Sequence, residues 1–172
     1  WTELDTLHRM GLEELLNDFG ITGISEEAKA DLNLAWHRLD PWPDSPPGLQ
    51  RLKSRFILAT MSNGNIALMV DMAKYAGLPW DTILGAELAH AYKPDAKTYL
   101  TGVELLHLKP EQVMMVAAHQ SDLLAAAKQG LRTAFVKRPL ERGVNGKVDT
   151  TPDPSFDYVC DDFRDLATQL GV

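Results

Sequence analysis

Three groups of polar residues have side chains whose types could do chemistry. The first is the run Ser62-Asn63-Gly64-Asn65. Its hydroxyl, amides and glycine turn suit the binding of an anion at a helix start. The second is Lys93, a cation placed directly before a proline, and the third pairs His119, a candidate base, with the carboxylate of Asp122. Each group alone also has an ordinary explanation, as a turn, an exposed lysine or a helix cap.

Short apolar strands that alternate with helices would position these groups. The pattern predicts strands over 56–61, 82–84, 113–117, 133–136 and 158–160, and helices over 3–19, 25–39, 65–75, 95–107, 122–129 and 163–170. This alternation is typical of a parallel sheet covered by helices on both faces. Because each polar group follows one of three successive strands, we expect all three to meet beyond the carboxyl ends of the strands, where such sheets bind ligands.

A proline-rich segment separates the first two helices from the predicted strands. Residues 40–48 (DPWPDSPPG) contain four prolines, so this segment cannot be the interior of a helix. We interpret it as a linker between two lobes. The chain then divides into a small helical lobe with the linker, residues 1–47, and an α/β lobe, residues 48–172.

Composition excludes several classes of protein. Acidic residues outnumber basic ones by 24 to 17, and no basic stripe is present, which argues against a nucleic-acid partner. No apolar stretch approaches the ~20 residues that cross a bilayer, and the first residues do not read as a signal peptide, so we expect no membrane partner and a cytoplasmic location. The single cysteine, Cys160, ends an apolar run and is expected to be buried rather than reactive.

The order of the polar groups resembles the haloacid dehalogenase superfamily. That family has an Asp nucleophile after its first strand, then Ser or Thr, then Lys, then one or two acids, and Ser62, Lys93 and Asp122 match the last three. The runs MSNGN, AYKPD, VMMVAAHQSD and LDPWPD resemble the type II 2-haloacid dehalogenase branch. The resemblance implies a Rossmann-like parallel sheet core with a helical cap, in which residues 1–47 are the C-terminal part of the cap plus the linker.

The nucleophile itself has no match in this sequence. No segment combines an apolar strand with the Asp that follows it in the family, and Asp5 and Asp18 lie in the cap region, where they are not credible substitutes. The family also uses an Arg near the start of the cap to receive the halide, and Arg9 lies too far along to match it. The resemblance therefore covers essentially the whole chain, but the first strand of the family's α/β core has no match in it.

The resemblance implies hydrolytic dehalogenation of a short 2-haloalkanoic acid to the 2-hydroxy acid. The reaction passes through an Asp ester, which divides one difficult step into two. Ser62 and nearby amides would bind the substrate carboxylate, and Asn63 would help to hold the departing halide. Lys93 would keep the nucleophile ionised. No metal or cofactor is implied.

Three further residues receive roles from the same resemblance. Asp122 would orient Lys93 or the hydrolytic water, and Tyr99 would line the site, although a core aromatic at this helix position explains Tyr99 equally well. His119 stands where some relatives have Asn, which places it among the candidate binding residues. Relatives often dimerise, and a homodimer is the protein partner that the resemblance implies.

Two alternatives remain open from the sequence. A Mg²⁺-dependent phosphatase of the same superfamily typically has an acid four residues before the second acid of the last motif, and here that position is Ala118. One acid fewer favours the dehalogenase. The other alternative is a non-catalytic α/β binding module, which takes the absence of a nucleophile at face value.

Overall fold

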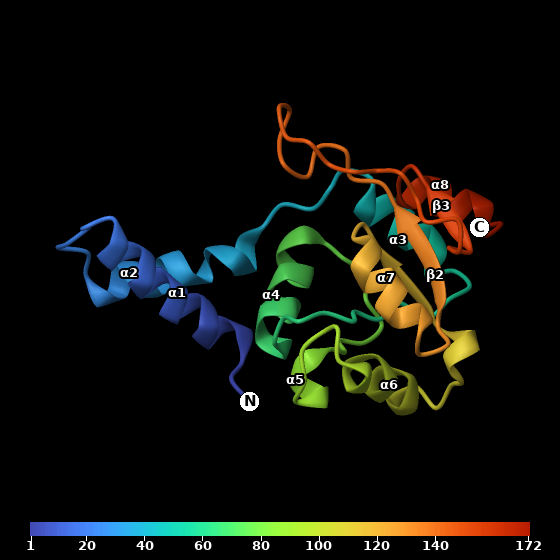
Figure 1. The fold of residues 1–172 in the computed structure, drawn as a ribbon, viewed down its shortest axis with the longest axis horizontal. Coiled ribbons are helices and arrows are strands. Elements are labelled where there is room, and N and C mark those ends of the chain that lie inside the picture. Colours follow the sequence, from blue (N-terminus) through green and yellow to red (C-terminus); the bar gives the residue numbers. More distant parts are fainter.

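The computed structural model describes residues 1–172, and it places a helical arm beside a core that contains a sheet (Figure 1). We call the arm the cap arm; it consists of α1 (Leu4–Asp18), α2 (Glu26–Asn33) and the 3₁₀ helix η1 (Leu34–Arg38). The core contains the remaining elements: α3 (Ser45–Leu52), α4 (Ile66–Ala76), α5 (Ala86–Ala89), α6 (Ala96–Leu105), η2 (Pro110–Gln112), β1 (Met114–Ala117), α7 (Gln120–Ala127), β2 (Arg132–Val136), β3 (Tyr158–Cys160) and α8 (Phe163–Gln169).

A parallel three-stranded sheet in the order β1-β2-β3 lies at the centre of the core. Side chains of a strand alternate between its two faces, and strand β2 shows this directly. Ala134 and Val136 pack with residues of α3 and α8 on one face, whereas Phe135 packs with residues of α6 and α7 on the other. The predicted α/β fold, with helices on both faces of a parallel sheet, is confirmed.

The two strands predicted nearest the N-terminus do not form a regular ladder. Segments 56–62 and 82–85 run side by side, and the isolated parallel bridges Ala59–Thr82 and Ser62–Gly85 are their only ladder pairs. The segment 56–62 has a neighbour on one side only. Side chains replace part of the backbone ladder here, because the Thr60 hydroxyl bonds both the N–H and the carbonyl of Leu84 and the Asp81 carboxylate accepts from the Leu58 N–H, so the apolar run stays irregular.

An apolar slot separates segment 56–62 from strand β1. Consecutive residues of both segments, Phe56–Ser62 and Val113–Val116, line a cavity of about 750 Å³, together with apolar side chains from α3 and α8. The backbone groups of Ile57, Ala59 and Met61 make no backbone hydrogen bond, and strand β1 has a neighbour only on its β2 side. Two unpaired strand edges therefore face each other across the slot.

Most of the helix starts and ends predicted from the sequence agree with the structure. The Ser25 hydroxyl accepts a hydrogen bond from the Ala28 N–H and caps α2, and Gly77 ends α4 with a left-handed backbone at φ 63°. Two predictions need correction. The second cap helix tightens to 3₁₀ geometry at Leu34, and the linker is shorter than predicted, because residues 45–48 form the first turn of α3. Proline is tolerated there because the N–H groups of a first turn have no partner within the helix. The division into 1–47 and 48–172 stays a prediction.

Buried residues at the end of the linker attach it to the core. The carboxylate of Asp44 accepts hydrogen bonds from Arg138 at 2.8 Å and from the Phe163 N–H at 2.9 Å. The Arg138 guanidinium also lies over the rings of Trp42 and Phe163. Burial alone would raise the pKa of Asp44, but Arg138 and the Phe163 N–H outweigh it and hold that pKa below the ordinary value.

Replacing Asp44 by Ala should destabilise the fold by about 3–5 kcal/mol, because Arg138 would keep its charge in a buried place without a carboxylate to neutralise it. Chemical unfolding of the two proteins measures the difference. Asp40→Ala is the matched control, since Asp40 is exposed and makes no ion pair, and it should leave the free energy of unfolding within about 0.5 kcal/mol. An equal loss in both variants would contradict the assignment.

No helix is both long and apolar enough to cross a membrane. Cys160 is fully buried in β3, and burial, reinforced by nearby carboxylates, raises the pKa of its thiol to about 11. The prediction that this cysteine is a packing residue is confirmed.

Candidate active site

The turn Ser62–Asn65 connects the irregular strand 56–62 to helix α4, and it keeps hydrogen-bond donors free. The Ser62 Oγ accepts a hydrogen bond from the Gly64 N–H at 3.0 Å, and this bond closes the turn. The hydroxyl hydrogen of Ser62 and the side-chain NH₂ of Asn63 have no partner within the protein. Donors that project from a helix start without partners suit an anion.

The side chain of Asn63 links this turn to the lysine segment. Its Oδ1 accepts a hydrogen bond from the Lys93 backbone N–H at 2.8 Å. Because the oxygen is used in this way, the amide is oriented so that only its NH₂ group is available to a ligand. The Lys93–Pro94 peptide bond, directly after this contact, is cis.

Lys93, Asp122 and Tyr99 form a compact polar group. The Lys93 Nζ donates to the Asp122 Oδ2 at 2.7 Å, and the Tyr99 hydroxyl donates to the Asp122 Oδ1 at 2.7 Å. Asp122 is the third residue of α7, and both of its oxygens are occupied by these side chains rather than by helix N–H groups. The cap explanation of Asp122 is therefore wrong, and Tyr99, although fully buried, also contacts the site.

The electrostatics of this group follow from its burial. Burial lowers the pKa of Lys93, and the contact with Asp122 only partly restores it. Burial, together with the same carboxylate, raises the pKa of Tyr99 well above its ordinary value, so the tyrosine stays protonated and remains a donor. A largely buried ammonium with one carboxylate partner and further free N–H groups can bind and neutralise a second anion.

His119 is placed differently from the other candidates. Its side chain is 67% exposed, and its Nε2 lies 2.6 Å from a carboxylate oxygen of Glu141 in the loop that follows β2. The imidazole makes no hydrogen bond with the side chains of Lys93, Tyr99 or Asp122. The structure thus brings Asn63, Lys93, Tyr99 and Asp122 into direct contact, with Ser62 next to Asn63, and leaves the His119 side chain outside that network.

Two residues that hold the Ser62–Asn65 turn in place were not found from the sequence. The Glu87 carboxylate accepts a hydrogen bond from the Ile66 N–H at the start of α4, and Gly85 lies so close to Ser62 that a Cβ there would meet the Ser62 carbonyl oxygen at 2.3 Å. Both contacts join residues more than twenty positions apart, and only the glycine before a short helix hinted at a close approach. No group of three or more His, Cys, Asp or Glu side chains is arranged to hold a metal ion.

The comparison with protein families decides where the chain belongs. Its sequence matches the haloacid dehalogenase-like hydrolase family over residues 2–130. The chain belongs to this family. Its solved neighbours at 44% and 46% identity are L-2-haloacid dehalogenases, so the resemblance found in the three motifs is confirmed.

Two crystal structures of such dehalogenases superpose closely on this haloacid dehalogenase-like chain. The L-2-haloacid dehalogenase PA0810 is 46% identical with a TM-score of 0.95, covering 99% of this chain and 72% of that one. The defluorinating L-2-haloacid dehalogenase Rha0230 is 44% identical with a TM-score of 0.96, covering 100% of this chain and 71% of that one.

A curated relative supports the same membership in the haloacid dehalogenase-like family. The (S)-2-haloacid dehalogenase 4A of Burkholderia cepacia is 33% identical over 113 residues, which is 64% of this chain and 49% of that protein. The chain therefore spans about half the length of this relative. The activity of these longer relatives is therefore proposed for this chain, in the next section.

Proposed function

We propose that these 172 residues form most of an L-2-haloacid dehalogenase, which converts a short (S)-2-haloalkanoic acid to the 2-hydroxy acid. The observation that carries the proposal is the largely buried Lys93–Asp122 pair, hydrogen-bonded to Tyr99 and linked through Asn63 to the turn with free donors. The 46% identity to an L-2-haloacid dehalogenase over nearly the whole chain supports it.

The nucleophile in this proposal is an Asp on a strand that precedes the cap and packs in the apolar slot. The slot suits an extended apolar segment, because its two walls are unpaired strand edges and its lining is apolar on both sides. Segment 56–62 and β1 both run toward the polar groups, since Ser62 ends one and Ala117 lies five residues before Asp122. A parallel strand between them would end at the same edge and present its next residue there.

The chemistry is a displacement followed by hydrolysis. A carboxylate oxygen of the Asp attacks the carbon that bears the halogen, and the halide leaves with the bonding electron pair, which gives an ester. Water then attacks the ester carbonyl, so the carboxylate is regenerated and the 2-hydroxy acid is released. In this scheme the Ser62 hydroxyl and nearby amides bind the substrate carboxylate, and the Asn63 NH₂ group contacts the departing halide.

Lys93 and Asp122 act together in this scheme. The Lys93 ammonium keeps the nucleophilic carboxylate ionised, and Asp122, held on its other oxygen by Tyr99, keeps the ammonium in place.

His119 is proposed as a binding residue at the rim, where it would reach the substrate only after leaving Glu141. Ala118, at a position where related phosphatases carry an acid, favours this reaction over Mg²⁺-dependent phosphate hydrolysis.

Halide release from (S)-2-chloropropionate in the presence of a chelator tests the proposed function. We expect stoichiometric chloride and lactate from the protein that carries the strand with the Asp, and none from the protein with that Asp changed to Asn. Phosphate release from an aryl phosphate that depends on added Mg²⁺, without chloride release, would instead identify a phosphatase. The absence of both activities would favour the non-catalytic binding module.

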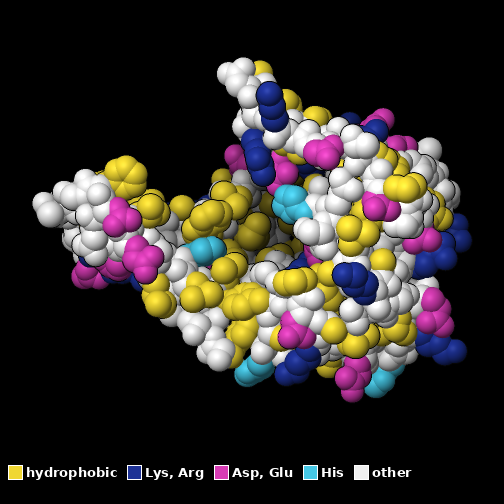
Figure 2. All heavy atoms as spheres, viewed as in Figure 1, with side chains coloured by type: hydrophobic (Ala, Val, Ile, Leu, Met, Phe, Trp, Pro, Cys, Tyr) yellow, Lys and Arg dark blue, Asp and Glu magenta, His cyan; other side chains and the backbone are white.

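The homodimer and the cytoplasmic location also remain proposals. Several large apolar side chains of the cap arm are exposed and form the kind of surface that a second copy would cover: Leu7, Met10, Leu15, Phe19, Ile21, Leu32, Leu34 and Trp36. Figure 2 shows such side chains on the cap arm and around the hollow between it and the core.

A further inference from the structure

A cluster of polar side chains at the junction between the cap arm and the core takes no part in the proposed chemistry. It consists of Asp5 in α1, His37 in η1, and Asn65 and Asp71 at the start and in the middle of α4. Asn65 and His37 are only 3% and 5% exposed. Buried polar groups so far from one another in sequence are costly to keep unless they are satisfied, and here each satisfies another.

Asp5 holds the end of the anion-binding turn. Its carboxylate accepts a hydrogen bond from the Asn65 side-chain NH₂ at 2.8 Å, and its backbone N–H donates to the Asn65 Oδ1 at 3.3 Å. Asn65 is the last residue of the turn that carries Ser62 and Asn63. The first helix of the cap arm therefore contacts the candidate substrate site through a single amide side chain.

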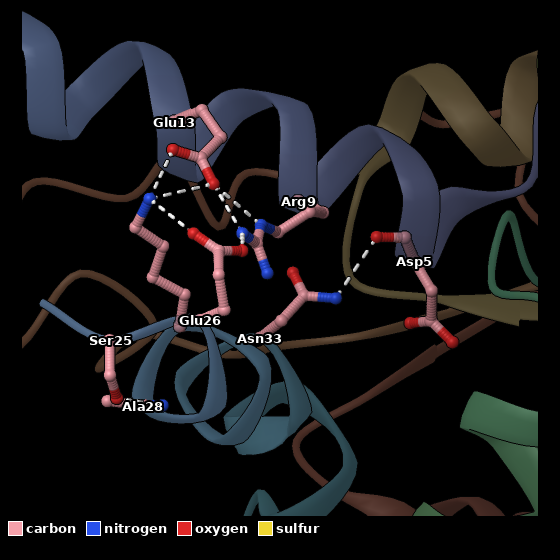
Figure 3. Close-up of polar contacts among 8 residues, drawn as sticks. Asp5, Arg9, Glu13, Ser25, Glu26, Ala28 and Asn33 are labelled. Carbon is pink, nitrogen blue, oxygen red and sulfur yellow. Dashed lines mark hydrogen bonds and ion pairs between the residues drawn. The ribbon is translucent and has the colours of Figure 1, made fainter.

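Asp5 is itself fixed within the cap arm. Its backbone carbonyl accepts a hydrogen bond from the Asn33 side chain in α2 at 3.1 Å, and the neighbouring ion pairs of Arg9 and Lys29 with Glu13 and Glu26 join α1 to α2 (Figure 3). These contacts use Arg9, in keeping with its exclusion as the residue that receives the halide. Figure 3 also shows the Asp5 carboxylate pointing away from this network, which leaves it available to the core.

His37 bridges the same carboxylate to the core. Its Nδ1 lies 2.8 Å from the Asp71 Oδ2, and its Nε2 lies 3.1 Å from the Asp5 Oδ1. Both neighbours are carboxylates, which only accept hydrogen bonds, whereas a neutral imidazole has one N–H to donate. Only the protonated ring can make both contacts, so loss of its proton must weaken one of them.

The ionisable groups that face His37 are Asp5 from α1 and Asp71 from α4; helix α2, which also packs on η1, contributes the neutral Asn33 beside Asp5. Burial opposes the charge of His37, but the hydrogen bonds to Asp71 and Asp5 outweigh it, and the pKa of His37 rises above its ordinary value of 6.5. The stabilisation that the protonated His37 gives to the folded state is complete below the ordinary value of 6.5. It is lost as the pH rises through the raised pKa of His37.

We propose that Asp5 is a positioning residue, which ties the cap arm to the Ser62–Asn65 turn through Asn65, and that His37 tightens this tie when it is protonated. The position of the cap arm and the geometry of the turn then depend on each other. The tie does not require the proposed dehalogenase activity; its effect on substrate binding does rest on that function.

NMR titration of the 172-residue chain from about pH 5.5 to about pH 9 tests the tie directly, because this range brackets the ordinary titration of histidine. We expect the His37 ring, the Asn65 side-chain amide and the Gly64 N–H signals to shift with one midpoint, above the ordinary histidine value. In His37→Gln the Asn65 and Gly64 signals should no longer shift with pH. If Asn65 and Gly64 are insensitive to pH while His37 titrates in the unaltered chain, the proposal is wrong, and this result needs no variant to fold.

Two substitutions distinguish the specific role of Asp5 from a general effect of removing one negative charge from α1. Asp5→Asn should lower the midpoint of His37 and remove the shift of Asn65, whereas Asp18→Asn, the same change on an exposed part of α1 without contacts, should alter neither. Similar effects of both substitutions would overturn the role of Asp5. Asp71→Asn should lower the His37 midpoint and leave the contact between Asp5 and Asn65 in place.

Binding of (S)-2-chloropropionate to the same samples connects the tie to the substrate site. We expect the affinity for (S)-2-chloropropionate to fall as the pH rises through the His37 midpoint. In His37→Gln this fall in affinity should be absent. Failure to bind at any pH would count against the proposed function and not against the tie, which the titration decides separately.

Discussion

Lys93→Ala is expected to lower kcat for halide release by about a thousandfold, with little change in the fold. The ammonium is the positive charge at the centre of the site, and it lies 2.7 Å from Asp122 in a largely buried position. Removal of the side chain takes away the charge that would keep a nucleophilic carboxylate ionised. The Tyr99 hydroxyl still donates to Asp122, so the remaining carboxylate keeps one partner.

The measurement is steady-state chloride release from (S)-2-chloropropionate by the protein that carries the strand with the Asp, accompanied by a thermal unfolding curve. Lys97→Ala is the matched control, because Lys97 is an exposed lysine in the first turn of α6, four residues after Lys93, and its side chain makes no ion pair. Normal turnover in Lys93→Ala would remove Lys93 from the site. A loss of activity that merely follows unfolding would appear in the melting curve.

Asp122 should behave as the partner of this lysine. Asp122→Ala is expected to abolish turnover as well. Asp122→Asn leaves Lys93 buried but removes the adjacent negative charge, so the pKa of Lys93, already lowered by burial, should fall further. The pH profile of kcat checks this expectation, since the residual activity of Asp122→Asn should increase as the pH is lowered and Lys93 regains its proton.

Gly85→Ala is expected to lower stability by about 2–4 kcal/mol and to displace the Ser62–Asn65 turn. Gly85 has φ 157°, a conformation that residues with a side chain rarely adopt, and a Cβ there would lie 2.3 Å from the Ser62 carbonyl oxygen and 3.1 Å from its nitrogen. Both are backbone atoms, so a rotamer change cannot relieve the contact. The turn itself must move, and KM should rise together with the loss of stability.

Gly11→Ala is the same chemical change as Gly85→Ala, but we expect it to stabilise the protein. Gly11 lies inside helix α1, and nothing would lie within 4 Å of an added Cβ. Alanine is a better helix former than glycine, so this variant should gain about 0.5–1 kcal/mol. Chemical unfolding and KM for both variants check the pair. An equally stable Gly85→Ala would mean that the 59–62 and 82–85 segments are held less tightly than the bridges indicate.

The order of the strands and helices in the core was predictable because it depends on local patterns. Runs such as VMMVA and TAFV are apolar, lie between turn residues and match β1 and β2 closely. The same reasoning failed where structure depends on a neighbour. The FILATM segment reads as a strand but stays irregular beside the slot, and the Pro46-Pro47 pair reads as a linker but starts α3 against α8.

The candidate site was predictable to the same extent. Ser62, Asn63, Lys93 and Asp122 follow strand-like segments, and the topology of a parallel sheet brings such positions together. The partners of these residues were not predictable, since Tyr99 could equally have been a core aromatic and the exposure of His119 depends on the loop that contains Glu141. The junction of Asp5, His37 and Asn65 joins residues up to 60 positions apart, and no local pattern announces it.

The two unpaired strand edges that line the slot have a consequence for how the chain behaves in solution. Ile57, Ala59 and Met61 on one side and β1 on the other offer backbone donors and acceptors, together with apolar side chains, to any extended segment that can enter. Such edges are templates for pairing between molecules. A segment that pairs with both edges removes this template, so we expect occupation of the slot to suppress aggregation through sheet extension.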